Sequence, residues 1–236
     1  MAYNALSPVI DVIIPAFNEE SSIGLVLGDM PWGLVREVIV CNNASTDNTG
    51  QVAAAAGATV LEQPRKGYGS ACLKGIHYLA AKPKEEQPDI VVFLDVDYSD
   101  HPEEMPALVN PIVEDDVDLV IGSRALGTKE RGSMQPQQVF GNWLATNLIR
   151  LIYRYNFTDL GPFRAIKWNK LLTINMEDPD FGWTVEMQVK AAKYGLKCTE
   201  IPVSYRRRVG VSKVSGTIRG SYLAGKKILW TIFKLW

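Results

Sequence analysis

The sharpest chemical feature of this 236-residue chain is a pair of aspartates, Asp95 and Asp97, with one residue between them. They directly follow the apolar run of residues 90–94, which predicts a buried strand. Two carboxylates this close are costly to hold together unless a cation compensates their charge. Oxygen ligands suit Mg²⁺ or Mn²⁺, and a partly hydrated cation of this kind suits a diphosphate. We therefore predict a divalent metal site at Asp95 and Asp97. The structural alternative is a cap cluster for the helix that Pro102 opens.

Two further loops carry groups that can bind a nucleotide. Asn42, Asn43 and Ser45 lie after a predicted strand, where a base or ribose commonly binds. The alternative is that Asp47 simply caps the next helix. In the loop Lys66-Gly67-Tyr68-Gly69-Ser70, two glycines beside a lysine predict the close approach of a phosphate to a helix N-terminus, with a plain loop as the alternative.

The charge of the chain is unevenly distributed. The whole sequence has 25 basic and 26 acidic residues, a formal net charge of −1. Residues 201–236 contain eight Lys and Arg and no Asp or Glu, which leaves 17 basic against 26 acidic residues before them. The cluster around Arg207 suits phosphate oxygens, and the chain end mixes lysines with Trp, Phe and Ile as an interfacial helix does. We expect this tail to meet an anionic partner, which can be a membrane surface, phosphate groups or nucleic acid. The membrane surface is the favoured one. A solvated loop, and a helix packed on the body or on a second copy, are the alternatives.

These segments belong to an alternating series of predicted strands and helices. Apolar or alternating runs predict strands at residues 9–14, 37–41, 58–61, 90–94, 118–121 and 197–205. Helical spacing predicts helices at residues 19–30, 47–56, 69–81, 102–113, 139–155, 183–194 and 217–236, with a polar loop at 126–138. Such alternation is typical of an α/β protein with a mostly parallel sheet and helices on both faces. Ligands of such sheets bind beyond the carboxyl ends of the strands.

Several classes of protein are excluded by the sequence. No run approaches about 18 consecutive apolar residues, and the N-terminus lacks the basic start and apolar core of a signal peptide. Three widely spaced cysteines and two histidines form no zinc or disulfide pattern, so we expect reduced thiols in a cytoplasmic protein. The loop after the first strand lacks the glycines of a dinucleotide fold. Gly220 to Lys227 departs from a P-loop because it ends in Lys and follows no strand.

Together, these segments resemble the family 2 glycosyltransferases of GT-A fold, with a Rossmann-like sheet, over nearly the whole chain. The most similar branch is that of the single-domain polyprenyl-phosphate and dolichyl-phosphate mannose or glucose synthases. The motifs that carry the resemblance occur in the family order: Val12-Ile-Ile-Pro-Ala-Phe-Asn-Glu-Glu20, residues 42–49, residues 66–69, Phe93-Leu-Asp-Val-Asp97, Gly122-Ser-Arg124, Asp159-Leu-Gly-Pro-Phe-Arg164, Gly182-Trp-Thr-Val-Glu186 and Arg207-Arg-Val-Gly-Val-Ser-Lys213. Two departures are visible. The family usually has two acidic residues where Asn42 and Asn43 stand, and Gly or Ala where Val96 stands.

The resemblance implies a role for each motif residue. The nucleotide sugar is expected to contact Pro15, Asn18, Glu20, Asn43, Lys66, Gly67 and Asp95. The metal is expected on Asp95 and Asp97, and the catalytic residues are expected to be Asp97, Arg124 and Glu186. The acceptor phosphate is expected to contact Arg164, Arg207, Ser212 and Lys213. The expected organisation is a catalytic domain over residues 1–215, with a donor half at about 1–124 and an acceptor half at 125–215, and then an amphipathic helix at 216–236.

The reaction implied is transfer of a hexose from a UDP-sugar or GDP-mannose to a polyprenyl or dolichyl phosphate, with Mg²⁺ or Mn²⁺ and with inversion. A lipid phosphate is already an anion and needs no general base, whereas an alcohol acceptor needs one, and Glu186 is the candidate. We expect an enzyme that is peripheral on the cytoplasmic face of a membrane and binds no nucleic acid. One alternative is a soluble or polysaccharide hydroxyl acceptor, with the tail as a homodimer helix. A non-catalytic nucleic-acid-binding domain is more remote, because it leaves the paired aspartates without a purpose.

Overall fold

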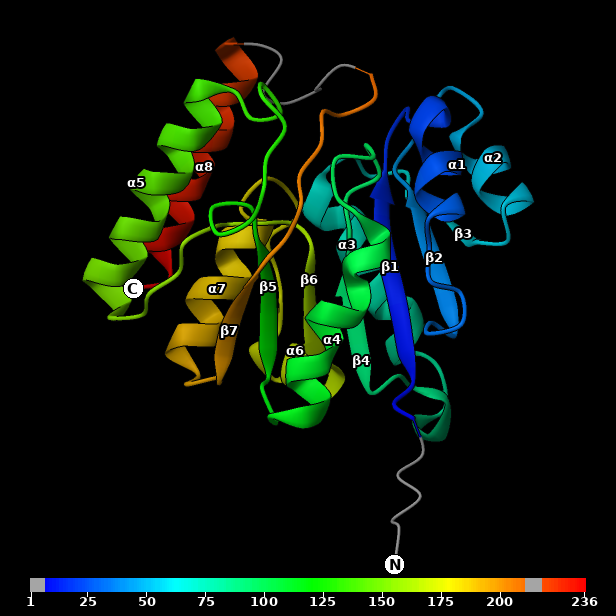
Figure 1. The fold of residues 1–236 in the computed structure, drawn as a ribbon, viewed down its shortest axis with the longest axis horizontal. Helices are drawn as coiled ribbons and strands as arrows, with labels where there is room; N and C mark the ends of the chain where they lie inside the picture. The colour runs from blue at the N-terminus through cyan, green and yellow to red at the C-terminus, as the bar shows by residue number, and fades with distance from the viewer. Residues whose placement is uncertain (1–6, 211–217) are drawn as a thin grey trace, which may run out of the picture.

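The computed structural model describes residues 7–210 and 218–236, and these form a seven-stranded sheet with helices on both faces (Figure 1). The strands are β1 (Ile10–Ala16), β2 (Glu37–Asn42), β3 (Thr59–Glu62), β4 (Ile90–Phe93), β5 (Leu119–Ser123), β6 (Arg164–Lys167) and β7 (Cys198–Pro202). The helices are α1 (Glu20–Gly28), α2 (Thr49–Ala55), α3 (Tyr68–Ala80), α4 (Met105–Glu114), α5 (Pro136–Tyr153), α6 (Trp168–Ile174), α7 (Trp183–Lys193) and α8 (Ile218–Lys234). Two short 3₁₀ helices, η1 (Lys84–Glu86) and η2 (Pro102–Glu104), complete the described elements.

The central strands β1, β2, β4 and β5 carry buried apolar runs because both faces of the sheet are covered. In β1, Ile13 contributes to one core, together with residues from α3, α5, α6 and α7. Its neighbours Val12 and Ile14 point to the opposite face and pack with residues from α1 and α4. Successive side chains of a strand alternate between faces, so a continuous apolar run is what a doubly covered sheet requires. The predicted α/β class is confirmed.

One central strand was not predicted. The sheet order is β3-β2-β1-β4-β6-β5-β7, and β6 pairs antiparallel with both β4 and β5. The other pairings are parallel, so the sheet is mostly parallel as expected. β6 has four residues, two of them charged, and four residues are too few to show a period. Because one sheet runs through the whole described body, the division into donor and acceptor halves stays a prediction.

Helices α5 and α8 lie side by side at one end of the molecule, outside α7 (Figure 1). The Tyr153 hydroxyl at the end of α5 donates to the carbonyl oxygen of Ile232 in α8 at 2.5 Å. Ile232 is fully buried, whereas other large apolar side chains of these two helices are exposed: Val139, Phe140, Trp143, Leu151, Leu223, Trp230 and Phe233. The C-terminal amphipathic helix is therefore confirmed. No helix within residues 7–210 and 218–236 is long and apolar enough to span a membrane.

Candidate active site

The carboxyl ends of neighbouring parallel strands meet at one edge of the sheet, and the predicted donor residues lie there. The register pairs Ala16 of β1 with Asn42 of β2, and Asn42 with Glu62 of β3. Pro15 is buried within β1. β4 pairs with β1 on its other side, and the chain continues from β4 towards Asp95. Parallel pairing therefore gathers the polar loops after β1, β2 and β4, as the general rule for ligand sites of such sheets requires.

Asp95 is held in a half-buried, polar position. The Tyr68 hydroxyl donates to its Oδ1 at 2.9 Å. Burial raises the pKa of Asp95 to about 6, and the charge of Asp97 adds to this rise. The hydrogen bond from Tyr68 and the charges of Arg124 and Arg208 act in the opposite direction. Two carboxylates and two guanidinium groups thus act on one another at this edge.

Asp97 is 7% exposed and its two oxygens face different partners. Oδ1 accepts hydrogen bonds from the backbone N–H of Ser99, at 3.0 Å, and from the Ser99 hydroxyl. Oδ2 lies 3.1 Å from Nη1 of Arg208, whose Nη2 lies 3.4 Å from Glu19. The backbone N–H of Val209 donates to the carbonyl oxygen of Asp97 at 2.9 Å, so the segment that carries Arg208 is attached to the Asp97 loop.

A third carboxylate, Asp100, lies close enough to Asp95 and Asp97 for their charges to act on it. It is buried, and neither of its oxygens has a hydrogen-bond partner among the described residues. Burial, followed by the charges of Asp95 and Asp97, raises its pKa well above the ordinary value. This accumulation of negative charge is what a bound cation relieves.

The donor set fits Mg²⁺ or Mn²⁺ because it consists of carboxylate oxygens. Within the described part of the chain, no group of three or more His, Cys, Asp or Glu side chains is arranged to hold a metal by itself. Asp95 and Asp97 would therefore share such an ion with oxygens from elsewhere. A diphosphate supplies oxygens of the right kind, and Mg²⁺ is commonly bound by one or two carboxylates together with substrate phosphates.

Asn18 and Glu20 join the loop after β1 to the loop after β2. The backbone N–H of Asn18 donates to Ser45 Oγ at 2.9 Å, and its Oδ1 accepts the N–H of Thr46 at 2.8 Å. Glu20 Oε2 accepts the N–H of Asn48 at 2.9 Å. These bonds fix the shape of both loops at the edge where the nucleotide is expected. Contact of either side chain with a nucleotide stays a prediction.

Asn43 fastens the next loop. Its Nδ2 donates to the carbonyl oxygen of Arg65 at 2.6 Å, and its Oδ1 accepts the N–H of Gly67 at 2.8 Å. An aspartate could accept but not donate, so the amide at this position suits the loop it holds. Beside it, the Lys66 ammonium lies 4.9 Å from the centre of the Phe17 ring. The loop after β3 is thereby fixed against the loops after β1 and β2.

The two glycines of this loop have a structural purpose that the sequence did not reveal. A Cβ built on Gly67, where φ is +139°, would meet the carbonyl group of Pro179, whose carbon would lie 3.3 Å away. A Cβ on Gly69 would lie 2.9 Å from the carbonyl carbons of Asp178 and Pro179. The Ser70 N–H donates to the Pro179 carbonyl oxygen at 2.7 Å. The open sides of both glycines are thus covered by the chain's own loop before α7, and the structure accounts for these glycines without a phosphate.

Arg124 is held in place by Asp159, which the sequence analysis had not assigned to the site. Nε and Nη2 of Arg124 donate to Oδ2 and Oδ1 of Asp159, both at 2.7 Å, and the Arg124 backbone N–H donates to Oδ2 at 2.8 Å. Burial alone would lower the pKa of Arg124, but the charge and hydrogen bonds of Asp159 raise it above its ordinary value. Arg124 is therefore a permanent, oriented cation that remains 11% exposed.

Arg164 does not have the surroundings of a phosphate-binding residue. Its side chain is fully buried. Nε donates to the Gly161 carbonyl at 3.0 Å, Nη1 to the Thr184 carbonyl at 2.9 Å and Nη2 to the Leu160 carbonyl at 3.1 Å. Burial lowers its pKa to about 10. The guanidinium is thus largely engaged by the backbone around β6, and its contact with an acceptor phosphate stays a prediction.

Glu186 is likewise engaged within the protein. Its carboxylate accepts the backbone N–H groups of Glu177, at 3.0 Å, and Asp178, at 2.7 Å, and it pairs with Lys190 at 2.7 Å. It is 3% exposed. In this arrangement Glu186 orders the loop that covers Gly69, and its carboxylate is not available to take a proton from an acceptor.

Arg207 is exposed and faces a different loop from Arg208. Its Nε and Nη2 donate to the carbonyl oxygen of Arg131 at 2.8 and 2.6 Å, and its backbone N–H donates to Glu130 at 2.8 Å. The structure thus separates two neighbouring arginines that the sequence could not distinguish. The other two predicted phosphate ligands, Ser212 and Lys213, lie outside the described residues.

Two residues of this site, Tyr68 and Asp159, were given no role by the sequence analysis, and Arg208 was taken only as part of the basic cluster around Arg207. Each stands inside a motif that had been recognised, but its role had been given to a neighbour. Their presence in those motifs was the only signal, because contact with Asp95, Arg124 or Asp97 depends on tertiary structure.

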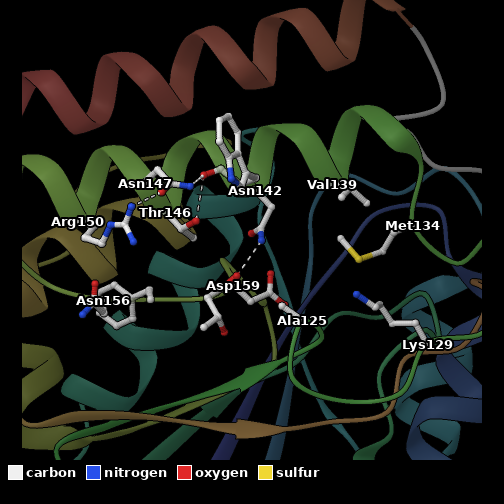
Figure 2. Close-up of a pocket in the computed structure, with 13 residues that line it drawn as sticks. Ala125, Lys129, Met134, Val139, Asn142, Thr146, Asn147, Arg150, Asn156 and Asp159 are labelled. Carbon is white, nitrogen blue, oxygen red and sulfur yellow. Dashed lines mark hydrogen bonds between the residues drawn. The ribbon is translucent and has the colours of Figure 1, made fainter.

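A cavity of about 510 Å³ lies between α5 and the loops after β5 and α5 (Figure 2). Met134, Val139 and Trp143 make part of its wall apolar, while Lys129 and Arg150 supply positive charge. Its remaining lining residues are Ala125, Asn142, Thr146, Asn147, Asn156, Phe157, Thr158 and Asp159. Because Asp159 also holds Arg124, the cavity adjoins the charged edge of the sheet.

Comparison with known proteins agrees with this architecture. The family model described as glycosyl transferase family 2 matches residues 11–173. An uncharacterised glycosyltransferase of Mycobacterium tuberculosis is 37% identical over 218 residues, covering 91% of this chain and 94% of the relative. An undecaprenyl-phosphate mannosyltransferase of Micrococcus luteus is 30% identical over 220 residues, covering 88% of each chain.

Among solved structures, glucosyl-3-phosphoglycerate synthase from M. tuberculosis in complex with Mn²⁺, UDP and phosphoglyceric acid has a TM-score of 0.76 and 25% sequence identity. The match covers 97% of this chain and 78% of that one. The agreement of fold, motif order and family model leads to one conclusion: the chain belongs to glycosyl transferase family 2 and is a glycosyltransferase of GT-A fold.

Proposed function

We propose that this glycosyltransferase moves a hexose from a nucleotide diphosphate sugar to a polyprenyl phosphate at a membrane surface. One observation carries the proposal: Asp95 and Asp97 share the carboxyl edge of the sheet with two arginines whose charges act on Asp95. Carboxylates that attract a cation, beside guanidinium groups that attract phosphate, suit a reaction with anions on both sides of the transferred sugar.

The donor half of the proposal rests on the loops after β1, β2 and β3. Asn18, Glu20 and Asn43 fix these loops by hydrogen bonds, and Lys66 with Phe17 adds a charged and an aromatic group beside them. The M. tuberculosis synthase was crystallised with UDP. We infer that a UDP- or GDP-sugar lies over these loops, with its diphosphate directed towards Asp95 and Asp97.

A divalent ion held by Asp95 and Asp97 would supply positive charge to the leaving diphosphate. The chain's own residues prepare for this. Tyr68 orients the Asp95 carboxylate, and the Ser99 hydroxyl and N–H orient the Asp97 carboxylate. The synthase structure that resembles this chain contains Mn²⁺.

For the acceptor, we infer that Arg124 is the central phosphate-binding residue. Asp159 holds its guanidinium by two parallel hydrogen bonds and leaves it partly exposed. Arg207, Ser212 and Lys213 stay as proposed further contacts. A phosphate oxygen of the acceptor attacks the anomeric carbon as the bond from that carbon to the diphosphate oxygen breaks, with inversion. No proton has to be removed from a phosphate anion, which agrees with the engagement of every oxygen of Glu186.

The polyprenyl part of the acceptor suits the cavity under α5. The apolar side chains of Val139 and Trp143 line this cavity and are also 50% and 58% exposed. Exposed apolar side chains of α5 therefore line the same cavity as Asp159, the partner of Arg124. The relative in Micrococcus luteus is described as acting with undecaprenyl phosphate, which supports a lipid acceptor.

The same end of the molecule is proposed to meet the membrane on its cytoplasmic face. α8 exposes Trp230 and Phe233 together with Lys226 and Lys234. Aromatic side chains at an interface and lysines near anionic headgroups each favour such binding, by roughly 1 kcal/mol per basic residue. α5 adds exposed Trp143 beside it.

A second candidate keeps the donor site and replaces the lipid by a small phosphorylated acceptor. The observation that favours it is the phosphoglyceric acid bound in the solved synthase. Arg124 and Lys129 would serve such an acceptor equally well. The exposed face of α5 and α8 would then cover a second copy of the chain in a homodimer.

Replacement of Asp97 by Ala tests the transfer chemistry. We expect the variant to retain the wild-type circular dichroism spectrum and melting temperature within a few degrees, since losing the bonds of Asp97 to Ser99 and Arg208 also removes its repulsion with Asp95 and Asp100. We expect release of nucleoside diphosphate from the sugar donor to fall by at least about 10³-fold, which is the scale of a lost electrostatic contact to a leaving group. Wild-type turnover by this variant would contradict the proposed metal site.

A further inference from the structure

The contact between Arg208 and Asp97 has a consequence for how the donor binds. Nη1 of Arg208 lies 3.1 Å from Oδ2 of Asp97, and Nη2 lies 3.4 Å from Oε1 of Glu19. One guanidinium therefore bridges a carboxylate of the proposed metal site and a carboxylate at the start of α1. The sequence analysis predicted neither of these two contacts of Arg208.

The segment that carries Arg208 is fixed on both sides of it. The Arg206 N–H donates to the Ser99 carbonyl and the Val209 N–H to the Asp97 carbonyl, both at 2.9 Å. The Arg206 guanidinium lies 3.4 Å from the centre of the Tyr98 ring and pairs with Asp29 at 3.2 Å. These contacts hold the backbone of the segment over the Asp97 loop, so the Arg208 side chain is the part that can change partners.

In this position the Arg208 guanidinium does not use all of its hydrogen-bond donors. Its Nε is buried and has no hydrogen-bond partner among the residues that the structure describes. Its side chain is 29% exposed, and that of Asp97 is 10% exposed. A guanidinium has five N–H donors in a planar fork that matches phosphate geometry, so this arginine has capacity left for an anionic ligand.

We propose that Arg208 is the cation that balances Asp97 until the metal binds, and that it then turns to the donor diphosphate. The inference rests on the proposed function, because it takes Asp97 as a metal ligand. A single carboxylate oxygen gains little from holding a guanidinium and a divalent ion together, because the two cations repel each other. Metal binding at Asp97 therefore competes with Arg208, and the diphosphate offers the displaced guanidinium a new partner.

This exchange makes metal and donor bind cooperatively. The metal alone must displace Arg208 and so binds weakly. The diphosphate alone meets an arginine that is already paired and carboxylates that repel it. Together, each removes the obstacle to the other, and the coupling between two ligands is reciprocal. Arg208 is thus assigned to the recognition of the leaving group, a role that the neighbouring Arg207 does not share.

The test is a measurement of Mn²⁺ affinity, without nucleotide, for the wild type and for Arg208→Gln. We expect the substitution to tighten Mn²⁺ binding about fivefold, the equivalent of about 1 kcal/mol for a partly exposed ion pair. In the presence of saturating Mn²⁺, the same variant should bind UDP or GDP, whichever binds the wild type better, about tenfold more weakly. Opposite signs for the two ligands are the signature of the exchange, and a purely structural role for Arg208 would weaken both.

Two variants serve as controls. Arg207→Gln removes a neighbouring arginine that faces the Arg131 carbonyl, and it should leave Mn²⁺ affinity unchanged. Asp97→Asn should abolish Mn²⁺ binding in either background. If Arg208→Gln unfolds, Arg208→Lys replaces it with an expected tightening of about twofold, since a lysine makes one contact where Arg208 bridges two carboxylates.

The outcomes separate this inference from the proposed function. Unchanged or weaker Mn²⁺ binding by Arg208→Gln, with binding still sensitive to Asp97→Asn, overturns the exchange and leaves the metal site intact. Mn²⁺ binding that is unchanged by Asp97→Asn overturns both the exchange and the proposed metal site.

Discussion

A single added methyl group at Gly69 should destabilise this protein, whereas the same change at Gly141 should stabilise it. Gly69 lies in the first turn of α3, where its missing side chain lets the loop before α7 approach. A Cβ there would lie 2.9 Å from the carbonyl carbons of both Asp178 and Pro179, closer than real Cβ atoms come to their neighbours. The loop would have to retreat, which strains the hydrogen bond of 2.7 Å between the Ser70 N–H and the Pro179 carbonyl.

The expected cost follows from those two contacts. Loss of one buried hydrogen bond costs about 1 kcal/mol, and accommodation of an oversized group in a packed region costs about 1–3 kcal/mol. We therefore expect Gly69→Ala to lower the free energy of unfolding by about 2–4 kcal/mol. Gly141 lies within α5 with no atom within 4 Å of its built Cβ. Gly141→Ala should raise the free energy of unfolding by about 0.5–1 kcal/mol, because alanine restricts the unfolded chain and favours the helix.

Urea unfolding of both variants and the wild type, followed by circular dichroism, measures the two changes. The Gly69 variant should also bind the nucleotide more weakly, since the loop that retreats packs against Gly67, the neighbour of Lys66. Wild-type stability of Gly69→Ala would refute the reasoning that these glycines exist for the approach of the loop. Weaker nucleotide binding at unchanged stability would instead return them to the phosphate role predicted from the sequence.

Two further predictions concern acidity and the membrane. Tyr68→Phe removes a hydrogen bond that favours ionised Asp95, whose pKa is raised to about 6 by burial and by Asp97. The metal-free site needs this carboxylate ionised before it can take up the ion, so kcat/KM for the donor at subsaturating Mn²⁺ should rise with pH through an apparent pKa near 6, and the variant should shift this midpoint to higher pH. A midpoint that stays or falls in the pH–rate profile contradicts this. The double substitution of exposed Trp230 and Phe233 by Ser should weaken sedimentation with anionic liposomes by about tenfold, while Trp32→Ser, in the loop after α1, should leave it unchanged. These exposed sites are preferable to a truncation, because Ile232 between them is fully buried and its removal would open the core. Equal binding by the double variant and the wild type would remove α8 from the membrane contact.

Much of the fold was predictable because its signals are local. The apolar runs at β1, β2 and β4 are continuous, since both faces of a parallel sheet are buried, and each run ends at a polar loop. The helix expected at residues 139–155 is observed as α5, Pro136–Tyr153, and the helix at 217–236 as α8, Ile218–Lys234. β6 was not predictable in this way, because its place between β4 and β5 is set by pairing with distant strands rather than by its four residues.

The candidate site was predictable only as a set of motifs. The sequence located Asp95 and Asp97 correctly at a strand end, but it contained no information on which arginine each carboxylate meets. Arg207 and Arg208 are adjacent and chemically identical, and only the path of the chain over the Asp97 loop distinguishes them. In the same way, Arg164 was expected to meet phosphate because of the family motif in which it stands. Its commitment to three backbone carbonyls could not be seen without the tertiary structure.

The central claim is that the acceptor is a lipid phosphate, and product analysis by mass spectrometry tests it most directly. The reaction would contain the purified protein, Mn²⁺, UDP-glucose and GDP-mannose, and equal concentrations of a short polyprenyl phosphate and 3-phosphoglycerate in detergent. We predict a hexosyl polyprenyl phosphate as the product, absent with Asp97→Ala. Exclusive formation of a hexosyl phosphoglycerate would contradict the lipid acceptor and leave the glycosyltransferase assignment standing.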